Sequence, residues 1–154
     1  MKQMKKRTAE SEVLTELILE VFRLNGAMLE AGNRITKPHG LTSARWQVMG
    51  AIDLAGQALT VAQIARRMGL ARQGVQRIVN DLRKLGMVVL DDNIDHKRAS
   101  LVSISEQGAK AMEKVNRAQI AWVNRLSDGL GERKLNQALK LLQAVRVRAR
   151  ELDR

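Results

Sequence analysis

The chain lacks cysteine and tyrosine, and it has one proline and three aromatic residues among its 154 positions. Without cysteine there is no disulfide framework, thiolate nucleophile, cysteine-based zinc site or thiol redox sensor. The scarcity of aromatic rings argues against RNA or single-stranded DNA as a ligand, because proteins that bind single strands stack bases on such rings. Binding to duplex DNA has no such requirement.

Candidates for metal binding and catalysis are also few. The two histidines, His39 and His96, lie far apart in the sequence, and neither belongs to an H-E-x-x-H motif. We therefore expect no metal site and no cofactor. Serine, aspartate and glutamate residues show no spacing typical of a nucleophile–base pair or of paired catalytic carboxylates, so an enzyme is not expected.

Long hydrophobic runs are missing as well. No run approaches the ~18 residues of a membrane-spanning helix, and the basic stretch 1–7 is not followed by the apolar segment of a signal peptide. We expect a cytoplasmic protein without a membrane partner. Hydrophobic residues nevertheless make up 45 % of the chain, too many for a disordered basic tail.

What the chain does have is positive charge. Lys and Arg number 27 and Asp and Glu 16, which gives a formal net charge of +11. Such an excess favours a polyanionic partner, either nucleic acid or an acidic membrane surface.

Two segments carry apolar residues at alternating spacings of three and four, as in a helix that packs against another helix. In the first segment, which begins near residue 11, the stripe consists of Leu14, Leu17, Val21, Leu24 and Met28. In the last segment it consists of Leu135, Ala138, Leu142, Val145, Ala149 and Leu152. We expect the first helix to end at Gly32 and the stretch 32–41 to form a loop around Pro38. The two stripes predict a seam shared by two copies of the chain.

Three helix starts follow in the middle of the chain. Thr42 is placed to cap the first of these helices, and Thr60 with Gln63 forms a capping box at the second. The third helix is expected from about Ala71 to Gly86, without a capping side chain at its start.

The hydrophobic period changes after this third helix. The runs 87–90 and 99–103 are short and strand-like, and the polar stretch 91–98 separates them. We predict a two-stranded ribbon. Ser105 is then placed to cap a further helix that extends to the turn at residues 128–129.

The segment 60–78 has the spacing of a helix-turn-helix. Ala65 is followed by Gly69 four residues later and by Val75 six residues after that. A small alanine lets the second helix approach, and a glycine accepts the positive φ of the turn. An ordinary helical hairpin is the alternative, but it would not explain the charge. Residues 60–86 hold six Lys or Arg and one Asp, a net +5.

The second helix of this motif presents polar side chains opposite its apolar face. Arg and Gln can make bidentate contacts with guanine and adenine edges in the major groove. We predict base contacts from Arg72, Gln73 and Gln76. Contacts with phosphate or with the minor groove are predicted from Thr60, Arg77, Lys97 and Arg98. The last two lie at the ribbon tip, for which a charged turn without a role is the alternative.

Over residues 11–152 the arrangement resembles the MarR family of winged helix-turn-helix regulators. The resemblance rests on the helix-turn-helix above, on Leu41-Thr42, on the run 85–88 that enters the ribbon, on Arg98 and on the run 104–108. It implies a mainly α fold with a small β-ribbon, in which dimerisation helices flank a winged helix-turn-helix domain. It also implies an obligate homodimer with one recognition helix per subunit in the major groove. In many members a small aromatic acid or phenol releases the DNA.

The expected organisation has four parts. Residues 1–10 form a flexible basic tail, 11–40 the first helix and loop of the dimerisation lobe, 41–104 the DNA-binding domain and 105–154 the C-terminal dimerisation helices. We expect a transcriptional regulator, a repressor whose affinity for a near-palindromic duplex site is tuned by a small molecule. The alternative is a nonspecific or architectural nucleic-acid-binding protein. A small-molecule-binding protein with an incidentally basic surface is a third possibility.

Two further groups of residues have a structural and a functional interpretation. Arg146, Arg148 and Arg150 are expected on a solvated helix face rather than at a second DNA site. Trp46 and Met49 are expected in the core rather than in the lining of an effector pocket.

Overall fold

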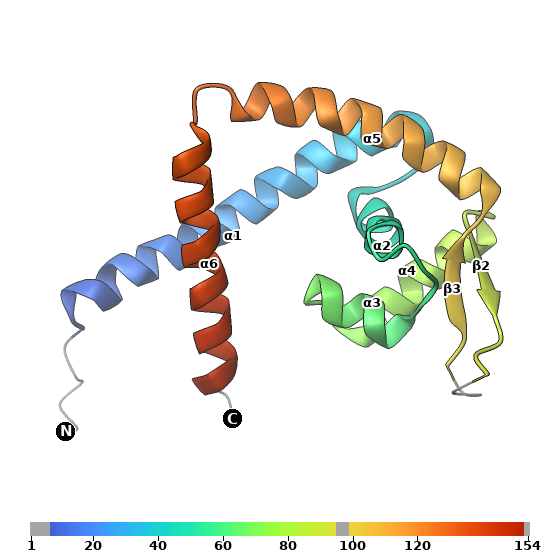
Figure 1. Ribbon diagram of the computed structural model, residues 1–154, viewed down its shortest axis with the longest axis horizontal. Coiled ribbons are helices and arrows are strands. Elements are labelled where there is room, and N and C mark those ends of the chain that lie inside the picture. Colours follow the sequence, from blue (N-terminus) through green and yellow to red (C-terminus); the bar gives the residue numbers. More distant parts are fainter. Residues whose placement is uncertain (1–6, 95–98, 153–154) are drawn as a thin grey trace. The chain divides into compact units, whose positions relative to one another are not determined.

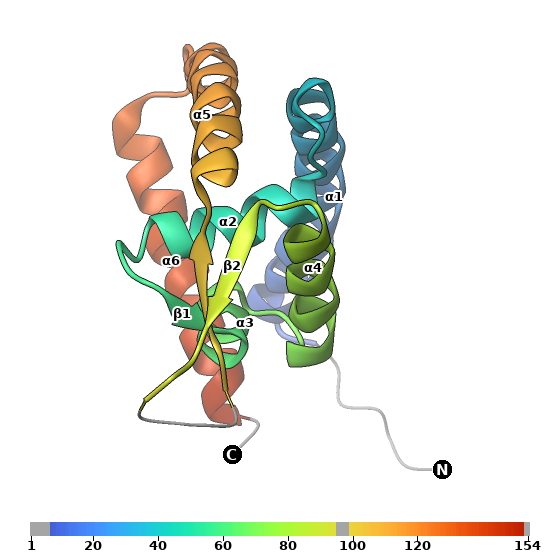
Figure 2. The same ribbon diagram turned by 90° about the vertical axis from the view of Figure 1, so that its right-hand side faces the viewer.

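The computed structural model describes residues 7–94 and 99–152, which form helices and one small sheet (Figures 1 and 2). The helices are α1 (Ala9–Thr36), α2 (Ser43–Asp53), α3 (Val61–Met68), α4 (Arg72–Lys84), α5 (Glu106–Ser127) and α6 (Glu132–Leu152), with a short 3-10 helix η1 (Lys37–His39). The strands are β1 (Leu59–Thr60), β2 (Val88–Asp91) and β3 (Leu101–Ile104). No helix in the described part of the chain is long and apolar enough to cross a membrane. The mainly helical fold with a small β element is confirmed.

The chain divides into two compact units, Met1–Asn116 and Arg117–Arg154. The first contains the sheet, helices α1 to α4 and the first half of α5. The second contains the rest of α5 and α6, joined by a turn in which Gly129 and Gly131 have positive φ. Apart from Val145, which is partly covered, the α6 side chains are exposed.

Helix α1 is longer than the sequence predicts. Thr8 caps its start by accepting a hydrogen bond from the Ser11 amide, and the helix continues through Gly32 to Thr36. The predicted end at Gly32 is wrong because this glycine serves packing rather than a turn. It is buried against α2, and a Cβ at this position would overlap the Ser43 side chain.

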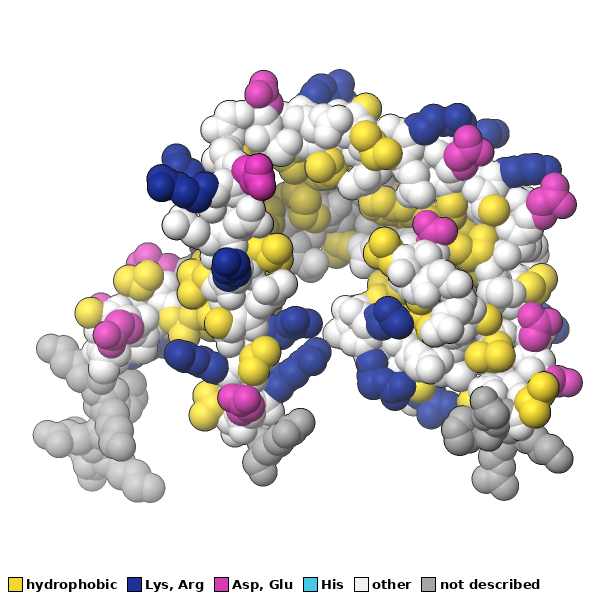
Figure 3. All heavy atoms as spheres, viewed as in Figure 1, with side chains coloured by type: hydrophobic (Ala, Val, Ile, Leu, Met, Phe, Trp, Pro, Cys, Tyr) yellow, Lys and Arg dark blue, Asp and Glu magenta, His cyan; other side chains and the backbone are white. Residues whose placement is uncertain are grey.

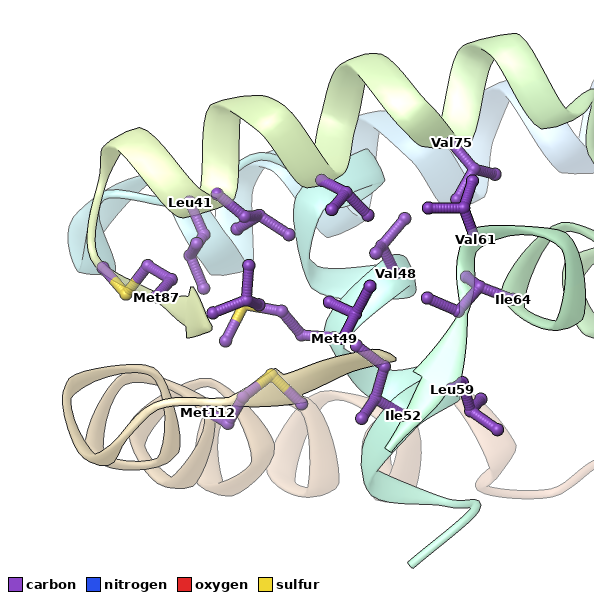
Figure 4. Packing of buried hydrophobic residues seen from close by; sticks show 14 of the residues in the cluster. Leu41, Val48, Met49, Ile52, Leu59, Val61, Ile64, Val75, Met87 and Met112 are labelled. Carbon is purple, nitrogen blue, oxygen red and sulfur yellow. The ribbon is translucent and has the colours of Figure 1, made fainter. Parts of the chain in front are cut away.

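The core of the first unit lies between α2, α3, α4 and the sheet. Val48, Met49, Ile64, Val75 and Val79 are fully buried in one cluster, part of which Figure 4 shows. The core position expected for Met49 is confirmed, and Trp46 packs against the same cluster. This core fixes α4 by one face and leaves its other face to solvent.

The sheet has three antiparallel strands in the order β1-β3-β2 (Figure 2). The predicted ribbon corresponds to β2 and β3, in which Leu90 pairs with Val102. The two-stranded prediction is wrong because Leu59 and Thr60 pair with Val102 and Leu101 on the other edge of β3. Strand β1 ties the start of α3 to the wing.

Candidate nucleic-acid interface

Helix α3 begins with the capping box that the sequence predicts. The Thr60 hydroxyl accepts a hydrogen bond from the Gln63 amide N–H at 3.3 Å, and the Gln63 side-chain oxygen accepts one from the Thr60 amide at 2.8 Å. The helix ends at Gly69, where φ is 66°. The Leu70 amide then donates to the Ala65 carbonyl at 3.0 Å, which closes the turn into α4. The helix-turn-helix is confirmed in its local geometry.

Helix α4 is anchored by its apolar face. Val75, Val79 and Leu82 are fully buried, and the start of the helix has no side-chain cap, as expected. On the opposite face Arg72, Gln73 and Arg77 are exposed and Gln76 is partly exposed, so the side chains predicted to contact DNA from this helix are accessible. Thr60 is also partly accessible.

One amide pair on this face was not predicted. The Gln76 side-chain amide donates a hydrogen bond to the Asn80 side-chain oxygen at 3.1 Å. Asn80 is exposed and lies one helical turn after Gln76. The four-residue spacing of two amide side chains is the sequence signal that would have pointed to it.

The only acid of the segment 60–86 has a basic partner. Asp81 lies 3.7 Å from the Arg45 guanidinium of α2. This ion pair joins α4 to α2 and offsets the Asp81 charge, while the six Lys and Arg side chains of the segment are exposed. Figure 3 shows basic side chains gathered over α3. The helix-turn-helix therefore presents a positive surface, as a polyanionic ligand requires.

The wing is only partly described. Lys97 and Arg98, the predicted contacts of the wing, lie outside the described residues. In the described part of the wing, Thr60 pairs with Leu101 at the start of β3, the end nearer the wing tip. The β1 pairing thus sets Thr60 next to the wing as well as at the start of α3.

A joint links the end of α4 to the start of α5. The Ser105 hydroxyl donates to the Gly86 carbonyl at 2.6 Å, and the Ser105 amide donates to the Met87 carbonyl at 3.0 Å. Ser105 also caps α5 by accepting from the Gly108 amide at 3.0 Å, as predicted. A Cβ at Gly108 would overlap the Met87 carbonyl. We call these four residues the α4–α5 joint.

An open groove of about 750 Å³ lies beside the α4–α5 joint. It is lined by Pro38 and His39 of η1, by Gly86 and Met87, and by residues of the first turns of α5. Neither Trp46 nor Met49 is among its lining residues. Within residues 7–94 and 99–152 there is no group of three His, Cys, Asp or Glu side chains able to hold a metal ion.

Comparison with known proteins identifies the fold and the family. The model of the MarR family matches residues 39–99. The uncharacterized protein Rv2011c of Mycobacterium tuberculosis is 37 % identical over 120 residues, which cover 78 % of this chain and 82 % of that protein. The chain belongs to the MarR family.

Solved structures of MarR-family regulators also match the fold of this chain. AbsC of Streptomyces coelicolor, a MarR-family transcriptional regulator, matches with a TM-score of 0.79 at 19 % identity over 96 % of this chain and 99 % of its own. The Mycobacterium tuberculosis regulator MOSR, solved in complex with DNA, matches with a TM-score of 0.70 at 20 % identity over 84 % and 96 %. This MarR-family chain therefore has the winged-helix fold of transcription regulators.

Proposed function

We propose that this MarR-family protein is a homodimeric transcriptional repressor that binds a near-palindromic duplex DNA site. The observation that carries the proposal is the solvent face of α4, where Arg and Gln side chains are accessible opposite the buried Val75, Val79 and Leu82. Side chains of these two types match the donor and acceptor patterns of guanine and adenine in the major groove.

The contacts divide by type. Arg72, Gln73 and Gln76 read base edges, while Thr60 and Arg77 contact the phosphate backbone. Lys97 and Arg98 of the wing contact phosphate or the minor groove. Residues 41–104 act as the DNA-binding domain in this proposal.

Homodimerisation is supported by the predicted stripes of α1 and α6. Leu14, Val21 and Leu24 on α1 are 39 %, 37 % and 50 % exposed, and Leu135 and Leu142 on α6 are 44 % and 38 % exposed. Figure 3 shows hydrophobic side chains at the surface of both helices. A second copy that buries these stripes would remove them from water. Residues 11–40 and 105–154 form the dimerisation lobe in this proposal.

Regulation by a small molecule is the remaining part of the proposal. The groove beside the α4–α5 joint is adjacent to residues that hold the end of α4. Two structural neighbours were solved with bound organic molecules, RdhR-CbdbA1625 with 2,4-dichlorophenol and CouR of Rhodococcus jostii with p-coumaroyl-CoA. We propose a small aromatic or phenolic effector, acting in the cytoplasm where the DNA is.

The test is a selection of duplex fragments by the purified protein. Binding of the enriched sequence and of a scrambled duplex is then compared at one fixed salt concentration. A specific regulator should bind its site about 10³–10⁷ times more tightly than other DNA. Equal binding of both duplexes would favour the architectural alternative, and no binding of either would favour a small-molecule-binding protein with an incidentally basic surface.

A further inference from the structure

The amide pair on α4 suggests a role for a residue outside the contacts proposed above. Gln73, Arg77 and Asn80 are spaced by four and three, so they share one face of the helix, and the three are exposed. Gln76 reaches toward this face by donating to Asn80 at 3.1 Å. Asn80 therefore lies among the side chains proposed to contact DNA, and its side-chain oxygen accepts a hydrogen bond from one of them, Gln76.

The hydrogen bond leaves Gln76 able to read a base. An amide side chain has two N–H donors and an oxygen with two acceptor sites. After one N–H is given to Asn80, Gln76 retains one donor and its whole oxygen. If the two amides are instead flipped so that Asn80 donates, Gln76 retains both donors and one acceptor site. Either arrangement satisfies adenine, which presents the N7 acceptor and the N6 donor in the major groove.

We propose that Asn80 is a positioning residue that holds the Gln76 amide ready to read the adenine of an A·T base pair. This inference rests on the proposed function of α4 as a recognition helix. A glutamine side chain must give up rotamer freedom when it binds, and this costs affinity. Asn80 removes part of that cost in advance, because its hydrogen bond favours one orientation of the Gln76 amide in the free protein.

The experiment measures base preference in four proteins: the wild type, Gln76→Ala, Asn80→Ala and the double variant. Each protein is titrated at one salt concentration with the duplex that the wild type selects. It is also titrated with duplexes in which each base pair of one half-site is replaced in turn. The wild type should prefer A·T at one position by about 5- to 150-fold. Gln76→Ala should abolish that preference, and Asn80→Ala should reduce it by about 1.4- to 2.3-fold, the range that a helical amide pair can supply. In the double variant Asn80→Ala should add no further loss of affinity for the selected duplex.

Two control variants separate positioning from other roles of α4. Asn80→Asp keeps an acceptor for Gln76 but adds negative charge, so it should weaken binding to all sequences while retaining the A·T preference. Lys84→Ala, one turn further on the same face, should also weaken all sequences alike. Thermal unfolding of each variant should differ little from the wild type, because an exposed amide pair on a helix stabilises the fold only slightly.

The outcomes that contradict the proposal are distinct. An unchanged base preference in Asn80→Ala overturns the role of Asn80. A loss of affinity for the selected duplex on Asn80→Ala that persists when Gln76 is already alanine means that Asn80 contacts DNA directly, which also overturns it. A wild type that prefers no sequence contradicts the proposed function itself, independently of Asn80.

Discussion

Two glycines of α1 differ in their surroundings, and the difference leads to opposite effects on stability. A Cβ at Gly26 would meet nothing within 4 Å, whereas a Cβ at Gly32 would overlap Ser43 of α2. Gly26→Ala should stabilise the protein by about 0.5–1 kcal/mol, because alanine loses less backbone entropy in a helix. Gly32→Ala should destabilise it by about 1–3 kcal/mol through overpacking. Urea unfolding at one protein concentration measures both, and a shift of the same sign in both variants would contradict the packing role of Gly32.

Gln76 and Arg77 are adjacent in the sequence, but Gln76 is proposed to contact a base edge and Arg77 the phosphate backbone. Gln76→Ala should cost about 1–3 kcal/mol of binding at the preferred site and relax the base preference there. Arg77→Ala should weaken binding to all sequences and reduce the salt slope of the dimer by about two, one for each subunit. Titration of matched and scrambled duplexes at several salt concentrations separates the two results. Identical base preferences in both variants and the wild type would mean that the recognition face is wrongly assigned.

At the residue scale, the sequence predicts what depends on neighbours in the chain. The caps at Thr42, Thr60 and Ser105 are local hydrogen bonds, and the structure contains all three. Glycine at position 32 predicts a helix end because glycine is a poor helix former, but its role is set by Ser43, a residue of another helix. Conformational preference is a property of one residue, whereas close packing depends on two.

At the scale of elements, two threonine caps provide a matched pair. Thr42 caps α2, and Thr60 caps α3 next to the wing. Replacing either by alanine should cost about 1 kcal/mol of folding stability. Only Thr60→Ala should also weaken DNA binding, because Thr60, unlike Thr42, is proposed to contact phosphate. Thermal unfolding and duplex titration of the two variants test this, and equal losses of binding would remove Thr60 from the interface.

In the sheet, strands β2 and β3 could be predicted from the sequence, whereas strand β1 could not. Strands β2 and β3 have runs long enough to show a strand-like pattern. Strand β1 has two residues, Leu59 and Thr60, and two residues show no period. Their strand character comes from pairing with Leu101 and Val102, about forty positions later. The amide pair of Gln76 and Asn80 was visible in the spacing but could be recognised only once both side chains were placed.

At the scale of the whole molecule, the positive charge predicts a strong response to salt. A dimer that contacts roughly 6–10 phosphates should lose about 10³–10⁵ in affinity between 50 and 200 mM salt. Fluorescence anisotropy with a labelled duplex measures this directly. A nearly flat response would contradict an interface built on the exposed Lys and Arg side chains.

The dimer is tested through Leu142, which lies on the α6 stripe. Burying an unpaired charge in a seam costs several kcal/mol, so Leu142→Glu should give a monomer or an unfolded chain. Specific DNA binding should then fall far more than nonspecific binding. Lys140→Glu, a charge change of larger size off the stripe, should leave the dimer intact. Sedimentation and circular dichroism distinguish these results, and a folded Leu142→Glu monomer with wild-type affinity for the palindrome would refute the dimer.

The α4–α5 joint determines where movement within the winged-helix unit can arise. Gly108 touches the Met87 carbonyl so closely that no larger residue fits, and Ser105 binds the backbone on both sides of that contact. The joint therefore packs the first turn of α5 directly against the end of α4, so a shift of that turn alone would break the Ser105 hydrogen bonds. At the other end of α4, a Cβ at Gly69 would meet nothing within 4 Å, so the turn from α3 lacks such a close backbone approach. We therefore expect a displacement of the start of α5 to be accompanied by a displacement of the end of α4.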